Sequence, residues 1–318
     1  MKIFLEFIKK TPSLRLKFIL IFTFLILLPA KNHYYSLDLS NPTPLIRPVT
    51  HQLISLSKYP INSTGTSTPL LSARSAIIID ASSKSIIYQK NPDQKLLPAS
   101  TTKIVTGLVA LEIYDPEDIV TIKSLNGTGQ KMGLEMEEKI TIKNLLYGLL
   151  VQSGNDAATA LAQFHPQGQD GFIDSMNQKT KVLGLKDTQF TNASGLDAYG
   201  HYTTVHDLAL LTTQAMKNET FRKMVSTQSI TVSNVDHTIS HELETINQLL
   251  GVVPGLVGVK TGWTDLAGEC LVTYTKRGNR EIITVILGSL DRFGESASLI
   301  DWVFANYQWT KVAPTTHS

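Results

Sequence analysis

Apolar and polar positions change period along the chain, and the two periods predict an α+β fold. Residues 76–80 and 85–89 are apolar runs joined by four polar residues, which is typical of a β-hairpin. Three β-rich runs follow late in the chain, at residues 256–263, 269–274 and 281–287. The last two are joined by a Lys/Arg/Gly/Asn stretch with the composition of a hairpin turn. We therefore expect the early hairpin and the three late runs to form one antiparallel sheet.

Between these β-rich regions, apolar residues recur at helical spacing. One helix is predicted to begin at Pro98–Lys103 and to continue through Leu111, with Pro98 restraining its entry and Ser100 capping its first turn. Other helices are predicted over 145–150, after Asn155, over 205–216 and over 301–307, and short strands over 120–123 and 139–142. We expect these helices to flank the sheet and to form a second, mostly helical lobe.

The N-terminal segment has the pattern of a targeting signal. Five basic residues precede an unbroken apolar run from Phe18 to Leu28, which predicts that the rest of the chain is translocated and acts outside the cytoplasm. Residues 1–31 are interpreted as a signal peptide or an uncleaved membrane anchor. The anchor is favoured because Leu28-Pro29-Ala30 lacks the first small residue of a typical cleavage site. The chain would then be held at the outer face of the cytoplasmic membrane, or be secreted if the segment is cleaved.

The remaining boundaries follow from composition. Residues 32–72 are rich in Asn, Ser, Thr and Pro and are predicted to be a flexible linker. The folded, catalytic domain is predicted over 73–310, and residues 311–318 form a C-terminal tail.

Composition and charge exclude several classes of function. A net charge of +2 without a clear basic patch argues against nucleic acid as a partner. Cys270 is the only cysteine, so no intrachain disulfide can form, and we expect it in the core. His237 and His241 lie four residues apart but lack a zinc-peptidase motif, and His201 and His206 are interpreted as packing or surface residues. No metal or cofactor is expected.

Ser100 and Lys103 form the first candidate constellation. Residues three apart share a helix face, so the lysine amine can reach the serine hydroxyl. A lysine buried in an apolar lobe would resist protonation and could accept the hydroxyl proton, which would activate the serine as a nucleophile. The spacing alone is common: Ser55 and Lys58 share it in a Pro/Ser/Thr-rich stretch, and a capping serine beside a surface lysine is the alternative.

Ser153 and Asn155 form the second candidate pair. They flank Gly154 at a tight junction between two predicted helices, where both side chains can point into a cleft. The same Ser-x-Asn spacing recurs at 124–126 and 175–177, so a plain capping turn is the alternative.

Lys260, Thr261 and Gly262 form the third candidate group, within the first of the late strands. Strand periodicity places Lys260 and Gly262 on one face, and a glycine there marks a close approach to the backbone. An edge strand protected by a lysine is the alternative.

The three groups occur in the order Ser-x-x-Lys, Ser-x-Asn and Lys-Thr-Gly, each on its expected element. In this combination the chain resembles the penicillin-recognising serine hydrolases, and among them the serine-type D-alanyl-D-alanine carboxypeptidases, over residues 73–307. Stretches that carry the same resemblance are Asn192–Asp197, Gly200–Thr204, Asn247–Leu250, Gly258–Thr264 and Ala267–Leu271. The resemblance implies a β-lactamase/transpeptidase-like fold and a substrate that is the stem peptide of peptidoglycan.

The resemblance also implies a role for each matching residue. Ser100 attacks the carbonyl between two D-alanines, and Lys103 accepts its proton. Ser153 and Lys260 relay a proton to the leaving D-alanine, and Asn155 orients Lys103 and a substrate amide.

Substrate binding falls to the strand residues. Thr261, Gly262 and Trp263 are the implied substrate-binding residues, with Thr261 and Lys260 holding the substrate carboxylate. The backbone N–H groups of Ser100 and Trp263 form the implied oxyanion hole.

One departure from related enzymes bears on β-lactam antibiotics. Class A β-lactamases use a loop glutamate for deacylation, whereas no glutamate occurs between Glu138 and Glu219 in this chain. A penicillin is therefore expected to acylate Ser100 and to leave slowly. Two alternatives remain open at this point: an endopeptidase that cuts peptidoglycan cross-links, and a non-catalytic domain that senses β-lactams or peptidoglycan.

Overall fold

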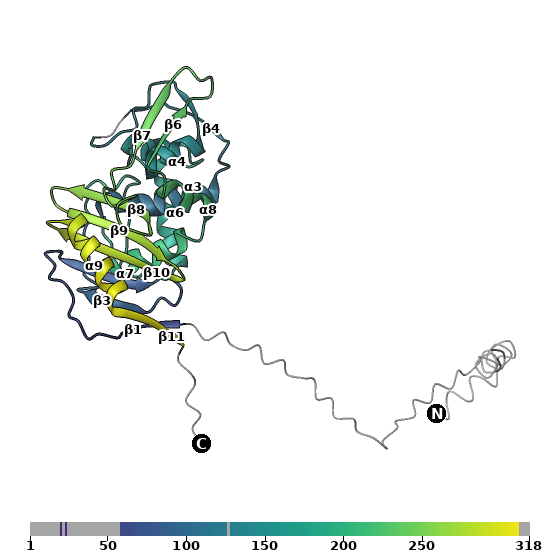
Figure 1. The fold of residues 1–318 in the computed structure, drawn as a ribbon. Helices are drawn as coiled ribbons and strands as arrows, with labels where there is room; N and C mark the ends of the chain where they lie inside the picture. Colours follow the sequence, from purple (N-terminus) through teal and green to yellow (C-terminus); the bar gives the residue numbers. More distant parts are fainter. Residues whose placement is uncertain (1–19, 21–22, 24–57, 126–127, 312–318) are drawn as a thin grey trace. The chain divides into compact units, whose positions relative to one another are not determined.

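The computed structural model describes residues 20, 23, 58–125 and 128–311 (Figure 1). The chain divides into two compact units, residues 1–54 and 55–318. The predicted targeting segment and residues 32–57 of the predicted linker lie almost wholly outside the described residues. Among the helices that are described, none has the length and apolar character that a membrane span requires.

A five-stranded antiparallel sheet forms the centre of the second unit, as the sequence predicts. Its strand order is β3-β2-β10-β9-β8. The strands are β2 (Ser75–Asp80), β3 (Ile86–Lys90), β8 (Leu256–Thr264), β9 (Gly268–Arg277) and β10 (Arg280–Ser289). Strand β8, which carries the Lys-Thr-Gly group, lies at the edge of the sheet.

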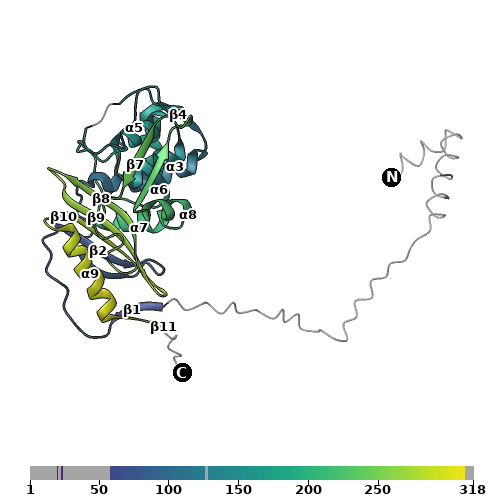
Figure 2. The same cartoon turned by 45° about the horizontal axis from the view of Figure 1, so that its top comes forward.

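Both faces of this sheet are covered by helices (Figures 1 and 2). Along β2, Ile77 and Ile79 join the large core shared with the helical lobe, whereas Ile78 packs with Leu299 and Ile300 of α9 (Arg292–Asn306). Because successive strand residues point to opposite faces, α9 covers one face, and α7 (Val205–Ala215) packs on the other. This double cover explains why all six residues of β2 are buried.

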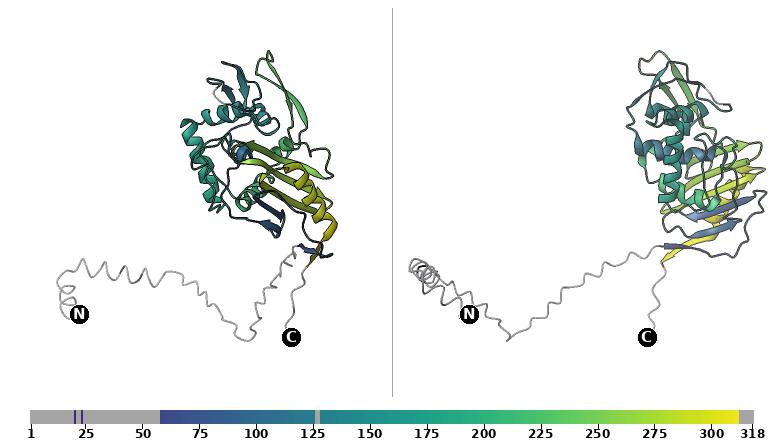
Figure 3. Two further views of the ribbon diagram at one scale, coloured as in Figure 1. Left: turned by 90° about the vertical axis from the view of Figure 1, so that its left-hand side faces the viewer. Right: turned by 180° about the vertical axis from the view of Figure 1, so that it is seen from behind.

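The helical lobe lies beside the edge strand (Figure 3). Its helices are α3 (Lys103–Ile113), α4 (Ile142–Leu150), α5 (Asn155–Gln163), α6 (Gly168–Val182) and α8 (Glu219–Val225). Two small hairpins complete it: β4 (Ile119–Thr121) with β5 (Lys139–Thr141), and β6 (Ser229–Ser233) with β7 (Ser240–Glu244).

Three expectations differ from the structure near element ends. Ser100 does not cap the helix: Ala99–Thr102 forms a 3-10 turn, η1, without a side-chain capping bond, and α3 begins at Lys103. The helix predicted over 301–307 begins at Arg292, because the Asp291 carboxylate accepts a hydrogen bond from the Gly294 N–H and caps it. His241 lies in strand β7, so its spacing from His237 is not helical.

Part of the segment predicted as a linker is a strand. β1 (Lys58–Asn62) pairs antiparallel with β11 (Tyr307–Lys311), although the two are far apart in the sequence. Trp309 of β11 connects these two strands to the five-stranded sheet, because its indole Nε1 donates a hydrogen bond to Asp80 Oδ2 of β2 at 2.6 Å. Lys58 therefore belongs to a strand, whereas Ser55 of the second Ser-x-x-Lys match lies outside the described residues. Residues 312–318 of the predicted tail lie outside the described part of the chain.

Candidate active site

Lys103 lies at the centre of the candidate site and is completely buried. Its Nζ is 2.8 Å from Ser100 Oγ, 2.6 Å from Asn155 Oδ1 and 2.6 Å from the carbonyl oxygen of Ser194. The first two groups predicted from the sequence therefore meet at this amine. Ser194 was not predicted as a site residue, because its contribution is a backbone carbonyl that carries no side-chain signal.

The three neighbours of Lys103 fix the direction of its lone pair. Asn155 Oδ1 and Ser194 O can only accept hydrogen bonds, whereas the Ser100 hydroxyl can donate. A neutral amine has two hydrogens and one lone pair. Its two hydrogens satisfy the two carbonyl-type oxygens, and its lone pair then faces the Ser100 hydroxyl. This arrangement suits removal of a proton from Ser100 Oγ.

The electrostatics of the site favour the neutral amine. Burial lowers the pKa of Lys103 well below its usual 10.5, and the nearby Lys260 lowers it further, against an opposing effect of Asp156. Burial also lowers the pKa of Lys260, to about 7, with a contribution from Arg292. Lys260 is 2% exposed, and its Nζ donates to the Thr261 carbonyl oxygen at 3.2 Å.

Gly262 brings the edge strand against the turn that carries Ser100. A Cβ at this position would lie 2.8 Å from the Ser100 backbone nitrogen and 3.0 Å from Ala99 Cβ. A side chain here would therefore force β8 away from η1. The close approach that the sequence predicts at Gly262 is thus present, and it places the third group beside the first.

The corner that carries Ser153 and Asn155 has a strained backbone and is held in place by hydrogen bonds. Ser153 is buried and has φ +64°, a conformation that non-glycine residues seldom adopt. Asn155 is the first residue of α5, and its Nδ2 donates to the Thr128 carbonyl oxygen at 2.6 Å. Its amide is therefore fixed on both sides, with Oδ1 directed at Lys103.

The Ser-x-Asn match at 175–177 has a different role. Ser175 and Asn177 lie on α6 and bond to the carbonyl oxygens of Gly171, Ile173 and Phe190. Asn126 lies outside the described residues. The match at 175–177 is therefore structural.

A cleft of about 700 Å³ opens over these groups. It is lined by Ser100, Thr128–Gln130, Ser153, Asn155, Gly195–Asp197, Ile246, Thr261–Asp265 and Arg292. Lys103 and Lys260 are buried behind this lining. Trp263 is 58% exposed at the rim.

These observations can be compared with proteins of known family. A family model described as D-alanyl-D-alanine carboxypeptidase, peptidase family S11, matches residues 62–290. The chain belongs to this carboxypeptidase family. The resemblance stated from the three motifs is thereby confirmed.

Relatives in sequence support the same assignment. The D-alanyl-D-alanine carboxypeptidase DacF of Bacillus subtilis is 34% identical over 247 residues, which cover 74% of this chain and 63% of DacF. DacC of Escherichia coli is 32% identical, covering 76% of this chain and 63% of DacC. The chain thus spans slightly less than two thirds of these relatives.

A solved structure supports the fold. The DD-transpeptidase of Streptomyces K15 has a TM-score of 0.71 with 31% identity, over 76% of this chain and all of that one. The expected β-lactamase/transpeptidase-like α+β fold is therefore confirmed.

Two of the residues that line the cleft of this chain could bind an anion. Thr261 Oγ1 is buried and has no hydrogen-bond partner among the described residues. Arg292, the first residue of α9, donates from Nη1 to the Gly262 carbonyl oxygen at 2.7 Å and has a buried, unpartnered Nε. Sequence reasoning missed Arg292, because only the packing of α9 on the sheet brings it to β8.

Cys270 and His206 occupy the positions expected for structural residues. Cys270 is buried in β9, where burial raises the pKa of its thiol to about 11. His206 is partly exposed, with its Nδ1 3.6 Å from Asp93 Oδ1.

His201 contacts η1, the turn that carries Ser100, through Thr102. Its Nδ1 accepts a hydrogen bond from the Thr191 N–H at 3.0 Å, so the neutral ring carries its proton on Nε2, which lies 2.9 Å from Thr102 Oγ1. The ring also packs edge-on against Phe190. The packing role predicted for His201 is therefore confirmed, with an added hydrogen bond to the residue before Lys103.

This buried histidine predicts a loss of stability in acid. Burial lowers the pKa of His201 from 6.5 to about 4, so the unfolded chain binds the proton first as the pH falls. Its contribution to the free energy of unfolding should be complete above pH 6.5 and decline by about 3 kcal/mol between pH 6.5 and 4. Urea unfolding across this range should show the decline in the wild type and not in His201→Gln, which keeps a donor towards Thr102. Parallel curves would contradict the assignment.

Proposed function

We propose that the chain is a serine-type D-alanyl-D-alanine carboxypeptidase, which removes the terminal D-alanine of peptidoglycan stem peptides through an acyl-enzyme on Ser100. The observation that carries this proposal is the orientation of Lys103. Its Nζ is held by two acceptors and lies 2.8 Å from Ser100 Oγ, at the base of a cleft large enough for a peptide end.

The first half of the reaction would form the acyl-enzyme. Ser100 Oγ attacks the carbonyl carbon between the two D-alanines as its proton passes to Lys103 Nζ. The developing oxyanion is stabilised by the backbone N–H groups of Ser100 and Trp263. The proton taken up by Lys103 is relayed through Ser153 and Lys260 to the departing amine, so Lys103 is neutral again when free D-alanine leaves.

The carboxylate of the substrate would bind beside β8. Thr261 Oγ1 can donate a hydrogen bond that it does not make in the described structure, and Arg292 and Lys260 add positive charge. In the second half of the reaction, water attacks the ester, and Lys103 removes its proton. The ester C–Oγ bond then breaks as Lys103 returns this proton to Ser100 Oγ, and the shortened peptide leaves with a free carboxylate.

The test uses the purified chain with an acyl-D-Ala-D-Ala peptide and with cross-linked muropeptides. The proposal expects free D-alanine from the peptide, and its loss in Ser100→Ala. Separated stems without free D-alanine would indicate an endopeptidase instead. Binding without any turnover would indicate a sensor.

The two lysines predict a bell-shaped pH dependence of kcat/KM. Lys103 must be neutral to act as a base, so activity should rise as it loses its proton at a pH below 10.5. Lys260 binds a carboxylate best as a cation, so activity should fall as the pH passes its pKa of about 7 in the free chain. In Lys260→Arg, which stays charged, the alkaline decline should move to higher pH. A wild-type profile that stays level above pH 7 would contradict this role for Lys260.

We also propose that β-lactams inhibit the enzyme covalently. Asp197 and Asp265 are the carboxylates among the described residues that line the cleft, and Asp197 already accepts a hydrogen bond from Thr264 at 2.8 Å. A penicillin on Ser100 would therefore lack the glutamate that β-lactamases use for rapid deacylation.

The site of action follows from the substrate. Peptidoglycan lies in the cell envelope, so the folded unit would act at the outer face of the cytoplasmic membrane, held by residues 1–31, or be secreted after their removal. Sequencing the N-terminus of the mature protein and testing its partition into detergent distinguish the two. A water-soluble form that begins after Ala30 would exclude the anchor.

A further inference from the structure

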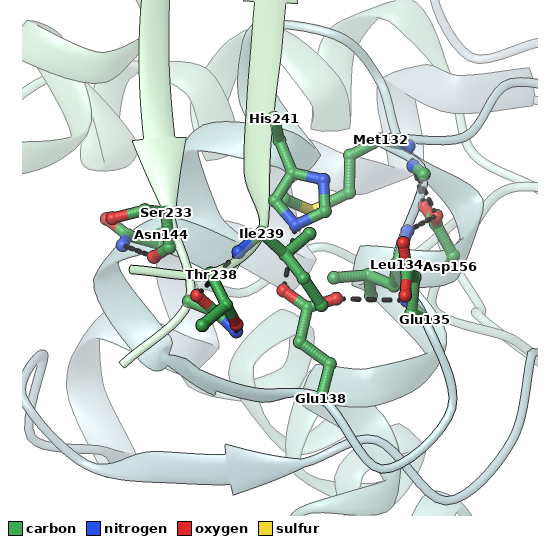
Figure 4. Close-up of polar contacts among 12 residues, drawn as sticks. Met132, Leu134, Glu135, Glu138, Asn144, Asp156, Ser233, Thr238, Ile239 and His241 are labelled. Carbon is green, nitrogen blue, oxygen red and sulfur yellow. Dashed lines mark hydrogen bonds and ion pairs between the residues drawn. The ribbon is translucent and has the colours of Figure 1, made fainter. Parts of the chain in front are cut away.

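Glu138 and His241 form a buried pair outside the catalytic cleft (Figure 4). Glu138 Oε1 and His241 Nε2 are 2.8 Å apart, and their side chains are 0% and 3% exposed. Glu138 directly precedes β5, whereas His241 lies on β7, about a hundred residues later. Neither residue lines the cleft, and the proposed mechanism uses neither.

The pair joins two segments of the helical lobe. One is the segment 128–138, which we call the wall segment; the other is the β6–β7 hairpin. The second oxygen of Glu138 accepts a hydrogen bond from the Glu135 N–H at 2.9 Å, so one carboxylate binds both segments. The turn of the hairpin is bonded nearby, where the Val235 N–H donates to the Lys139 carbonyl oxygen at 2.8 Å.

The wall segment leads directly to the catalytic groups. Its Thr128 and Gln130 carbonyl oxygens accept hydrogen bonds from the Nδ2 and the backbone N–H of Asn155, at 2.6 and 2.7 Å. The Asp156 carboxylate accepts hydrogen bonds from the backbone N–H groups of Met132, Gly133 and Leu134. Asn155 thus holds the start of the wall segment, Asp156 its middle, and the Glu138–His241 pair its end. Figure 4 shows the contacts of Asp156 and of the Glu138–His241 pair.

The end of the β6–β7 hairpin leads directly to the same cleft. At the end of β7, the Glu244 N–H donates to Gln152 Oε1 at 3.2 Å, next to Ser153. Two residues further on, Ile246 lines the cleft. The relative position of the wall segment and the hairpin therefore determines how Thr128–Gln130 and Ile246 are placed around a substrate.

We propose that Glu138 and His241 are positioning residues, which lock the wall segment to the β6–β7 hairpin and thereby hold Asn155 against Lys103. A buried hydrogen-bonded pair adds little net stability, because its hydrogen bond replaces hydrogen bonds to water. Its hydrogen bond is directional, however, so it restricts the relative position of the two segments more than apolar packing does. The catalytic part of this inference rests on the proposed function.

Three variants test the pair. His241→Asn places its amide nitrogen near the position of the histidine Nδ1. The asparagine side chain is therefore too short to reach Glu138. His241→Gln places it near Nε2 and retains the hydrogen bond. His237→Asn is the matched control, since His237 is an exposed residue in the turn of the same hairpin, and its ring is hydrogen-bonded to Ser233 Oγ, away from Glu138 and the wall segment.

The first measurement is independent of catalysis. Hydrogen exchange of the amides of Met132, Gly133 and Leu134 should be at least about tenfold faster in His241→Asn than in the wild type, because the wall segment opens locally. His241→Gln should restore slow exchange, and His237→Asn should leave it unchanged. Unchanged exchange in His241→Asn would overturn the proposal, even if the chain proved to have no peptidase activity.

The second measurement concerns catalysis, at a temperature where every variant is folded. Both kcat/KM for an acyl-D-Ala-D-Ala peptide and the acylation rate by a fluorescent penicillin should fall about tenfold in His241→Asn and less than about threefold in His241→Gln. A purely structural role would lower the melting temperature and leave both rates unchanged, and that result would overturn the catalytic part. Absence of D-alanine release and of acylation in the wild type would instead refute the proposed function.

Discussion

Replacing Lys103 with methionine is expected to lower kcat/KM for D-alanine release by about 10²–10⁴-fold, the range that a positioned general base contributes. Methionine fills a similar volume but cannot accept the Ser100 proton. Acylation of Ser100 by a penicillin should slow by a similar factor, because the same amine serves both reactions. Steady-state assays and the rate of labelling by a fluorescent penicillin measure the two effects.

The same variant has a second signature in the pH dependence of stability. The pKa of Lys103 is lowered in the folded chain, so between that pKa and 10.5 the unfolded chain binds one proton more. The wild type should therefore gain stability relative to Lys103→Met by about 1.4 kcal/mol per pH unit as the pH rises through this window. A constant difference between their unfolding free energies would mean that Lys103 is charged in the folded chain and cannot act as the base.

Replacing Gly195 with alanine is expected to damage both stability and activity. Gly195 has φ +87°, and a Cβ there would overlap the carbonyl oxygen of Ala99, directly before Ser100. Relief of this overlap must separate the 192–197 loop from η1, which also moves the Ser194 carbonyl oxygen away from Lys103. We expect a loss of more than about 3 kcal/mol in unfolding free energy and about 10² or more in kcat/KM.

Gly184→Ala is the matched control for this effect. Gly184 has φ +72°, but no atom lies within 4 Å of its Cβ position. Its replacement should cost only the left-handed backbone penalty of about 1–2 kcal/mol and leave kcat/KM unchanged. Equal losses in the two variants would show that the contact between Gly195 and Ala99 has no special role.

The sequence predicted the sheet and the positions of the three motifs because both depend on local patterns. Strand periodicity placed Lys260 and Gly262 on one face, and the glycine marked the approach to Ser100 that the structure contains. Spacing of three residues likewise placed Lys103 near Ser100. The helical cap predicted for Ser100 was wrong, because a 3-10 turn precedes the helix and its hydroxyl meets Lys103.

The remaining site residues depend on contacts between distant segments. Arg292 reaches the cleft only because α9 returns across β9 and β10, and the Ser194 carbonyl has no side-chain pattern at all. β1 was predicted as linker because its short, proline-containing sequence gains stability only from pairing with β11. The Glu138–His241 pair likewise joins segments that no local spacing relates.

The most direct test of the account is to find where a penicillin binds. Its central claim is that Ser100, Lys103, Asn155 and β8 meet at one cleft. Ser100 is activated there, and its β-lactam adduct hydrolyses slowly. Mass spectrometry of the chain after incubation with benzylpenicillin, followed by peptide mapping, should show one long-lived adduct on the peptide that contains Ser100, and none in Ser100→Ala. Rapid penicillin hydrolysis without an adduct, or an adduct on another residue, would contradict it.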